Sequence, residues 1–341
     1  MRTLTRRELN RALLARQLLL ERAQLPLPAA LDAVCGIQSQ YAPSMYIGLW
    51  SRLAGFGRDD LTRALEDRSV VQATLMRSTI HLVSRADFWP LALAVRDVRR
   101  AAWLRARRDL TAPAMAGAAR AVRNRLTGGQ ELRRAEIDAL VGRERTLGTG
   151  LWVDLVRVPP SGTWERRRAD RFALADDWVG PPPDRSGAAA HLVRRYLAAF
   201  GPASRKDIAG FTGFALRPLD AILRGLELRR FASEEGEELL DVPGAPLPDP
   251  DTPAPPRYLP TWDASLLTHA RRTGVLPEEH RPKLFGTTTP QSFPTFLVDG
   301  AVAGTWRHAG GEIVLDPFAP LAADDEAALR AEAVGLAALH A

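Results

Sequence analysis

The stretch Gly201-Pro-Ala-Ser204-Arg-Lys-Asp207-Ile-Ala-Gly-Phe-Thr-Gly213 indicates the fold more directly than any other part of the sequence. Its opening Gly-Pro pair ends a helix predicted over 191–200, because neither residue continues a helix well. Ser204 then caps a short second helix, and Asp207 three residues later completes a capping box. The stretch therefore predicts two helices separated by a sharp break.

The residues that follow predict the rest of a compact unit. A turn rich in Gly and Thr leads to a third helix at about 216–226. Two strands, 228–231 and 238–242, then flank a turn of glutamates and glycine. Three helices followed by a β-hairpin are typical of the winged helix-turn-helix.

The segment 113–176 shows the same pattern with a different charge. Helices are predicted at 115–126, 134–141 and 150–156, and a hairpin with a Pro-Pro-Ser-Gly tip follows at 159–162. The predicted return strand, 164–174, carries Arg166, Arg167, Arg168 and Arg171. A basic hairpin beside a helix-turn-helix is suited to gripping phosphates, so these arginines are predicted to bind DNA.

The two ends of the chain complete the predicted organisation. Residues 1–110 resemble the same unit more loosely, and a proline-rich linker begins near Pro243. In the tail, Asp299-Gly300 between two apolar runs predicts a tight hairpin. The predicted fold is mainly α with β-hairpin wings: three tandem winged helix-turn-helix units and a C-terminal α/β segment. Their predicted ranges are 1–110, 111–185, 186–245 and 246–341.

Composition narrows the class of protein. The net charge is +6 and the pI about 10.1, which favours a polyanionic partner, although only two lysines accompany the many arginines, a bias typical of G+C-rich genomes. No apolar run approaches the ~20 residues of a membrane span, so no membrane partner is expected. The single cysteine, Cys35, is expected to be a small buried hydrophobe. A cytoplasmic, nucleoid-associated location is the expectation.

The usual catalytic fingerprints are missing from the sequence. It has no phosphate-binding loop, no Gly-x-Gly-x-x-Gly after a strand and no Gly-x-Ser-x-Gly. Six scattered histidines and one cysteine give no zinc-like spacing. We therefore expect neither a cofactor nor a metal ion.

Gln38-Ser39-Gln40 is the least ordinary motif. Gly36 and Pro43 bracket it, so a non-helical connection is expected, and residues two apart then point the same way. Two carboxamides would project together from one loop. The alternative is that both glutamines merely cap backbone groups.

Several motifs together carry a family resemblance. Gln38-Ser-Gln40, Met76-Arg-Ser-Thr-Ile-His-Leu82, Tyr258-Leu-Pro-Thr-Trp-Asp263 and Phe296-Leu-Val-Asp-Gly300 occur in the order found in the AlkZ-like DNA glycosylases, a tandem winged-helix superfamily, and Gly304-Thr-Trp-Arg307 follows. The similarity covers nearly the whole chain. Glycine usually stands in the family where this sequence has Ser78.

The resemblance implies a C-shaped protein that cradles double-stranded DNA and excises N-alkylated purines, notably bulky N7-alkylguanine. Some members unhook interstrand crosslinks, and several protect antibiotic producers from their own genotoxin. The family's catalytic Gln-x-Gln falls on Gln38 and Gln40. A sister branch has Gln-x-Asp, so Gln40 places this sequence on the narrower, toxin-resistance side.

Further residues are predicted to meet DNA, each with a structural alternative. Thr79 and His81 share one face of a predicted strand, and Arg77 precedes them. The histidine is equally well explained as a satisfied structural residue. Arg307 is a phosphate candidate, whereas its neighbour Trp306 is expected to be core.

Two functions of different classes remain. A DNA glycosylase acting on alkylated purines in duplex DNA is favoured, and the alternative is a non-catalytic winged-helix regulator. Regulators generally dimerise on a palindrome, whereas three units in one chain favour a monomeric clamp. Four glutamates, Glu234, Glu235, Glu237 and Glu238, make the third hairpin acidic, so that unit is expected to pack against its neighbours or to use Arg217 and Arg224.

Overall fold

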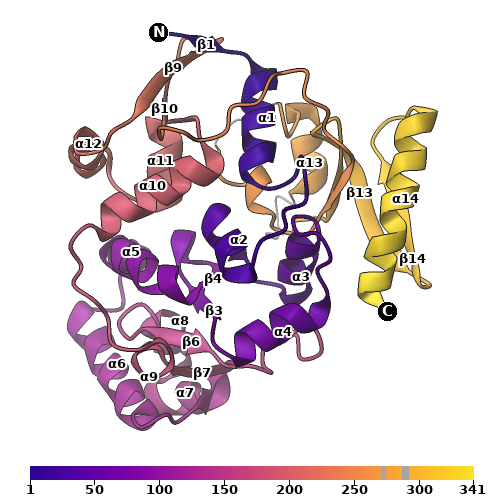
Figure 1. Cartoon of the computed structure of the whole chain (residues 1–341). Helices are drawn as coiled ribbons and strands as arrows, with labels where there is room; N and C mark the ends of the chain where they lie inside the picture. Colours follow the sequence, from indigo (N-terminus) through magenta and orange to yellow (C-terminus); the bar gives the residue numbers. More distant parts are fainter. Residues whose placement is uncertain (270–273, 286–291) are drawn as a thin grey trace.

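The computed structural model describes residues 1–269, 274–285 and 292–341 (Figure 1). Over these residues the architecture is mainly α-helical, with three β-sheets. Three segments share the element order helix, strand, helix, helix, strand, strand, and we call them the first, second and third repeats. Among the described residues, none of the helices combines the length and the apolar character needed to cross a membrane.

The first repeat follows an N-terminal strand and helix. These are β1 (Thr3–Leu4) and α1 (Arg6–Arg16). The repeat consists of α2 (Leu27–Ala33), β2 (Ile37–Gln38), α3 (Ala42–Trp50), α4 (Arg58–Glu66), β3 (Val70–Thr74) and β4 (Ile80–Ser84). Between β3 and β4 lies the single turn η1 (Met76–Ser78).

A long helix leads into the second repeat. Ser84 caps α5 (Arg85–Ala106), its side-chain oxygen accepting a hydrogen bond from the Asp87 backbone N–H. The second repeat comprises α6 (Ala112–Leu126), β5 (Leu132–Arg133), α7 (Arg134–Val141), α8 (Arg143–Thr149), β6 (Leu155–Arg157) and β7 (Arg171–Leu174). The short α9 (Ala175–Val179) ends it.

The third repeat contains the stretch Gly201–Gly213, whose two helices and sharp break agree with the prediction. It consists of α10 (Ala188–Phe200), β8 (Ala203–Ser204), α11 (Arg205–Thr212), α12 (Leu216–Arg224), β9 (Arg229–Ser233) and β10 (Glu238–Asp241). The predicted capping box at Ser204 and Asp207 is present. It begins α11 and so separates that helix from α10.

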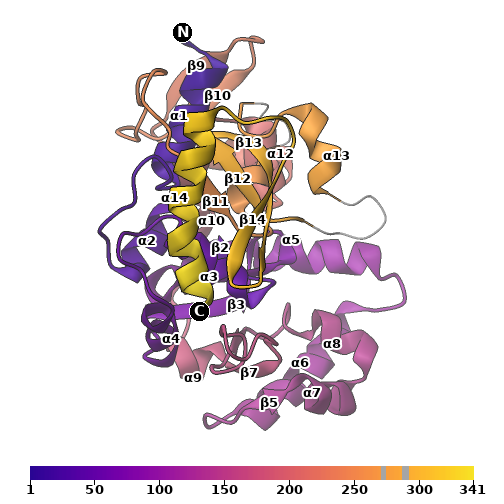
Figure 2. The same cartoon turned by 90° about the vertical axis from the view of Figure 1, so that its right-hand side faces the viewer.

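The first two repeats are joined through a single sheet. Its strand order is β2-β4-β3-β6-β7-β5, so β3 of the first repeat pairs antiparallel with β6 of the second. Gln72 is opposite Arg157 and Ala73 is opposite Val156 in this pairing. The second repeat thus lies below the first in Figures 1 and 2, fixed by backbone hydrogen bonds.

The C-terminal segment forms a separate four-stranded sheet. It contains β11 (Arg257–Leu259), β12 (Thr295–Val298), β13 (Ala301–Ala309) and β14 (Glu312–Pro317). Between β11 and β12 in the sequence lie η2 (Ala264–Leu266), η3 (Glu278–His280) and α13 (Arg281–Leu284). The predicted Asp299-Gly300 hairpin is confirmed, with φ of 45° and 78° at the two residues. The last helix, α14 (Ala323–His340), packs against β14 and α3 (Figure 2).

Two sequence predictions in the second repeat are wrong. The third helix is α8 at 143–149 rather than 150–156, and only 171–174 of the predicted return strand is a strand. The apolar residues after Gly150 instead enter a turn and β6, which pairs with both β3 and β7. Leu147 on α8 is 54% exposed, so that helix lacks a clear apolar face.

Candidate active site

The Gln38–Gln40 segment is extended because of the residues on either side of it. Gly36 adopts a φ of 77°, and a Cβ there would lie 2.9 Å from Val83 Cγ1 and 3.0 Å from the Leu82 carbonyl oxygen. Only glycine therefore fits the turn that leads from α2 into β2. Pro43 stands in the first turn of α3, where its missing N–H costs nothing. The predicted non-helical connection is confirmed.

The two carboxamides touch each other. Gln38 Nε2 donates to Gln40 Oε1, so the side chains do project together. Gln38 is only 3% exposed, whereas Gln40 is on the surface. Among the described residues, no donor reaches the buried Gln38 Oε1. A buried carboxamide oxygen without a donor favours a bound water or ligand group as its partner.

His81 lies in the middle strand beside this pair. It is opposite Gln38 of β2 on one side and Ala73 of β3 on the other. Burial, reinforced by nearby Arg77 and Arg99, lowers the pKa of His81 to about 4, so the imidazole is neutral at physiological pH.

Thr79 fixes the protonation of the His81 ring. The Thr79 carbonyl oxygen is 3.1 Å from His81 Nδ1, and the Thr79 hydroxyl oxygen is 3.4 Å from it. The proton therefore belongs on Nδ1, which leaves Nε2 as the acceptor. The predicted shared face of Thr79 and His81 is confirmed, while their contact with DNA stays a prediction.

The turn before Thr79 accommodates Ser78, where the family usually has glycine. Arg77 and Ser78 both adopt left-handed backbone conformations, with φ of 53° and 58°. Glycine takes such a conformation without strain, whereas serine takes it at a cost of roughly 1 kcal/mol. The turn therefore keeps its geometry without the glycine. Arg77 is exposed at its tip.

Gln72 is a site residue that the sequence reasoning missed. Its Nε2 donates to the Ser39 hydroxyl oxygen at 3.2 Å, which steadies the residue between the two glutamines. A Cβ on Gly162 would lie 2.6 Å from Gln72 Oε1, so the arginine-bearing hairpin of the second repeat packs directly against the Gln72 side chain. The available signal was an amide within the apolar run Val70-Val-Gln-Ala73.

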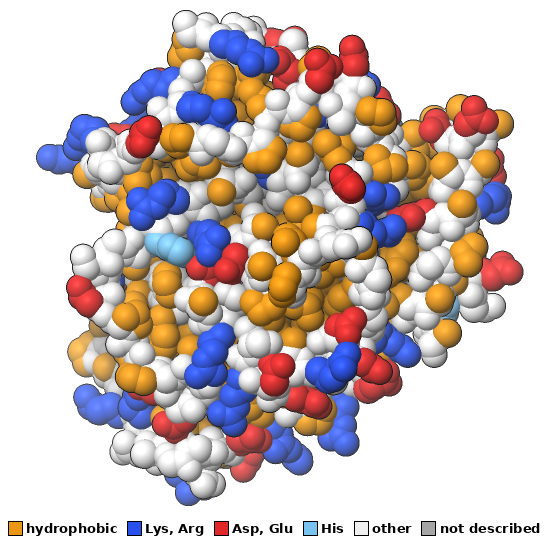
Figure 3. Space-filling view, viewed as in Figure 1, with side chains coloured by type: hydrophobic (Ala, Val, Ile, Leu, Met, Phe, Trp, Pro, Cys, Tyr) orange, Lys and Arg blue, Asp and Glu red, His pale blue; other side chains and the backbone are white. Residues whose placement is uncertain are grey.

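The four predicted hairpin arginines lie together. We call residues 158–171 the arginine hairpin. Arg166, Arg167, Arg168 and Arg171 surround a recess of about 330 Å³ to which Arg133 also contributes. The first three are exposed, and cationic side chains recur over the lower part of the face in Figure 3. Such a recess suits a phosphate, because five guanidinium groups converge on it against a single carboxylate, that of Asp170, among its described lining residues.

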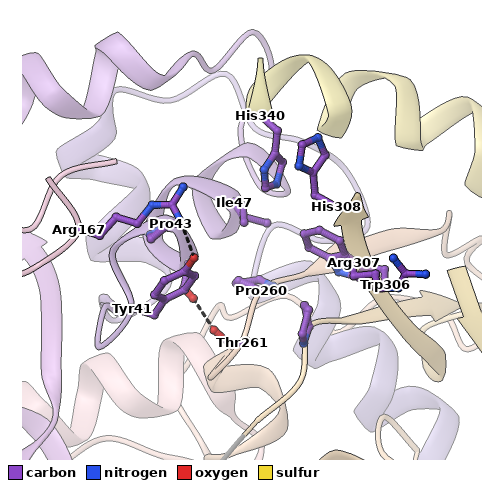
Figure 4. Close-up of a pocket in the computed structure, with 12 residues that line it drawn as sticks. Tyr41, Pro43, Ile47, Arg167, Pro260, Thr261, Trp306, Arg307, His308 and His340 are labelled. Atoms are coloured by element: carbon purple, nitrogen blue, oxygen red, sulfur yellow. Dashed lines mark hydrogen bonds between the residues drawn. The ribbon is translucent and has the colours of Figure 1, made fainter. Parts of the chain in front are cut away.

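The arginine hairpin also reaches the glutamine segment. Arg167 Nη1 donates to the hydroxyl oxygen of Tyr41, the residue after Gln40, at 3.0 Å. Arg307 of β13 lines a neighbouring recess together with Tyr41 and Arg167, and Trp306 is buried as expected, with Nε1 donating to the Leu259 carbonyl oxygen at 3.0 Å (Figure 4). Residues from three distant parts of the sequence therefore meet beside Gln40.

Two further groups of interest are buried. Cys35 is buried, and desolvation raises the pKa of its thiol, so it behaves as a small hydrophobe. Asp263 pairs with Arg52 at 3.0 Å in the interior. Burial would raise the pKa of this carboxyl, but the Arg52 guanidinium and the Ser265 donors bring it below its ordinary value. Asp263 thus orients an arginine.

Known proteins share sequence and fold with this chain. Residues 31–339 match the family profile described as DNA glycosylase AlkZ-like. An interstrand DNA cross-link repair glycosylase from Streptomyces sahachiroi is 26% identical, over 89% of this chain and 88% of the relative. The solved structure of the Streptomyces sahachiroi DNA glycosylase AlkZ superposes with a TM-score of 0.78 at 21% identity, covering 99% of this chain and 96% of that one. The chain therefore belongs to the AlkZ-like family of DNA glycosylases.

Proposed function

We propose that this DNA glycosylase excises bulky N7-alkylated purines, interstrand crosslinks among them, from duplex DNA. The observation that carries the proposal is the contact between Gln38 and Gln40, with a buried Gln38 oxygen that has no donor among the described residues. The name of the Streptomyces sahachiroi relative supports crosslinks as substrates. Family membership favours this enzyme over the regulator.

Amide side chains suit this reaction. An N7-alkylated purine is cationic, so when the C1′–N9 bond breaks its electron pair neutralises the base, and no general acid is required. The sugar becomes an electron-poor oxocarbenium ion that a water must attack. Carboxamide oxygens accept hydrogen bonds and oppose positive charge without titrating. Gln38 and Gln40 are proposed to hold this water and to face the sugar.

His81 is proposed to support the pair as a neutral group. His81 is paired with Gln38 across the sheet and offers Nε2 as an acceptor. Because its pKa is low, the imidazole stays neutral and adds no positive charge beside the oxocarbenium ion. Thr79 sets the tautomer through its contacts with Nδ1. These roles require no cofactor.

The surrounding repeats are proposed to hold the duplex. Their shared element order supports three winged-helix units in one monomeric clamp, with the sequence-derived boundaries 1–110, 111–185, 186–245 and 246–341. The arginine hairpin, with Arg77 and Arg307, is proposed to grip phosphates. An open clamp suits a bulky lesion better than a snug pocket that a base must enter.

Genotoxin self-resistance is proposed as the biological setting. Gln40, where the sister branch has aspartate, supports it. Deleting the gene should make its host more sensitive to one DNA-alkylating natural product and should leave its sensitivity to simple methylating agents nearly unchanged. Equal sensitisation to both would favour general alkylation repair.

Single-turnover excision of N7-methylguanine from a duplex tests the catalytic assignment. Replacing Gln38 or Gln40 by alanine should lower the rate by about 10²-fold or more while leaving duplex affinity nearly unchanged. Gln40→Asp should keep part of the activity, since a carboxylate offers the same acceptor and adds opposing charge. Gln130→Ala, at an exposed glutamine of the second repeat, is the matched control.

The capping alternative predicts a different pattern. If the glutamines only satisfy backbone groups, alanine should lower the melting temperature and activity together. A folded double alanine variant that excises at the wild-type rate would remove the catalytic assignment.

A further inference from the structure

A second recess adjoins the glutamine segment, and neither Gln38 nor Gln40 lines it. It encloses about 300 Å³ between the start of α3, the arginine hairpin, β13 and the last turn of α14. Tyr41, directly after Gln40, forms one wall, and His308 and His340 form the opposite one (Figure 4). A substituent on a purine held at Gln40 would therefore lie next to this recess.

The walls of the recess are rich in rings. His308 and His340 stack with their centroids 4.3 Å apart and an angle of 17° between the rings. Trp306 meets His340 edge-on, with centroids 6.1 Å apart at 84°. Tyr41 is 44% exposed, so part of its ring is open to a ligand. Aromatic faces and edges favour a planar ring system as their partner.

The polar groups of the recess limit the charge of its occupant. Arg167 and Arg307 stand along it, so a cation would be repelled. Burial, followed by the effects of His308 and Arg167, lowers the pKa of His340 to about 4, so its ring is neutral. Its Nε2 is buried, and no described residue is within hydrogen-bond distance of it. A buried polar atom of this kind is satisfied when a ligand or water supplies the partner.

The volume limits the size of the occupant. Sites for drug-sized ligands generally measure about 300 to 1,000 Å³, so this recess suits one small ring system rather than a whole natural product. The recess also depends on residues near both ends of the chain, Tyr41 and His340. Its shape thus belongs to the assembled fold and not to one repeat.

We propose that this recess is a subsite for a planar, fused-ring substituent of the lesion, neutral or anionic, which the His308–His340 stack and Tyr41 hold while Gln38 and Gln40 act on the sugar. The subsite rests on the proposed glycosylase function and adds to it a preference among substrates. Adducts with such a substituent are then excised at lower protein concentration than adducts with a methyl group.

Binding of a small probe tests the recess without any catalysis. Quinoline-2-carboxylate, a planar two-ring anion, should bind the full-length protein with one saturable site in titration calorimetry. His308→Ala should weaken this binding about 3- to 10-fold, the range expected for loss of one aromatic contact. His308→Phe, which keeps a flat ring, should retain it. Val334→Ala, at a residue of α14 that is 71% exposed, is the matched control.

Excision of two lesions then separates the subsite from the glycosylase assignment. Duplexes carrying N7-methylguanine and N7-(quinolinylmethyl)guanine are compared at subsaturating protein. His308→Ala should lower excision of the quinolinyl lesion by a similar 3- to 10-fold and leave the methyl lesion unchanged. Failure of the wild type to excise either lesion would refute the proposed function. Excision of both without a quinolinyl preference, or probe binding that His308→Ala does not change, would refute the subsite alone.

Discussion

The second and third repeats share one element order, yet their hairpins carry opposite charge. The arginine hairpin joins β6 and β7, whereas residues 233–238, which we call the glutamate hairpin, join β9 and β10. In the arginine hairpin Arg168 pairs with Asp170, and Arg171 pairs with Glu131. Arg166 and Arg167 form no ion pair with the described carboxylates. This hairpin keeps charge available for a polyanion.

The glutamate hairpin is occupied by its own chain. Arg6 contacts Glu235 at 2.8 Å, and the Arg6 backbone N–H donates to Glu234 at 3.0 Å. Strand β1 pairs parallel with β9, which covers the edge of that sheet. Behind it, Arg16 and Asp241 form a buried ion pair at 2.7 Å. The same structural unit has thus become a scaffold in one repeat and a candidate DNA contact in the other, and charge is what distinguishes them.

The largest expected effect concerns the scaffold. Asp241→Ala should lower the free energy of unfolding by about 3–5 kcal/mol, because it leaves the Arg16 guanidinium buried without its carboxylate. Denaturant unfolding measures this loss. Asp220→Ala removes the partially exposed pair with Arg205 in the same repeat and should cost no more than about 1 kcal/mol. Equal losses would show that the third repeat is not anchored at Asp241.

The next effect concerns DNA. Reversing Arg166, Arg167 and Arg168 to glutamate should weaken binding to all duplexes by about 10²-fold near 0.1 M salt, since each reversal removes a phosphate contact and adds repulsion. Fluorescence anisotropy with several unrelated duplexes measures it. The control reverses Arg217 and Arg224, exposed on α12 of the third repeat. If the two variants lose affinity equally, the contrast between the repeats does not extend to DNA.

Local sequence signals predicted much of this arrangement. The box at Ser204 and Asp207 and the Asp299-Gly300 turn were confirmed, because both depend on residues a few positions apart. The glutamine segment was predicted for the same reason, since Gly36 and Pro43 bracket it. The assignments of catalytic and DNA-binding roles stay predictions.

Features that depend on distant residues were not predictable from the sequence. The pairing of β3 with β6 joins edge strands from two repeats, and the residue pattern of neither strand indicates which strand it will pair with. Helix α8 was misplaced because Leu147 faces solvent and the apolar residues after it belong to a strand. The contact of Gly162 with Gln72 and the His308–His340 stack likewise arise only when the repeats and the tail assemble.

Salt dependence sharpens the same comparison with a moderate effect. If about six phosphates are neutralised, the logarithm of the association constant should fall against log salt with a slope of about −5. Removing three contacts with the arginine-hairpin reversal should bring the slope to about −3. The Arg217 and Arg224 reversal should leave it unchanged. A nearly flat slope in the wild type, or preference for one sequence, would argue for the regulator.

The smallest effect is the pH dependence of the glutamate hairpin. Hydrogen bonds from Arg6, and then from Ser233, lower the pKa of Glu235 below its ordinary value. A carboxyl whose pKa is lower in the folded than in the unfolded protein stabilises the fold above its ordinary pKa, and this stabilisation is lost as the pH falls through the folded value. Glu235→Gln should therefore lower the melting temperature slightly at pH 7, and the difference from wild type should shrink towards pH 4 and below. Thermal unfolding across that range measures it, with Glu237→Gln on the same hairpin as the control because Glu237 takes no part in the Arg6 contact. Duplex affinity should be the same for both variants, and a gain in affinity for Glu235→Gln would show that the glutamate hairpin also faces DNA.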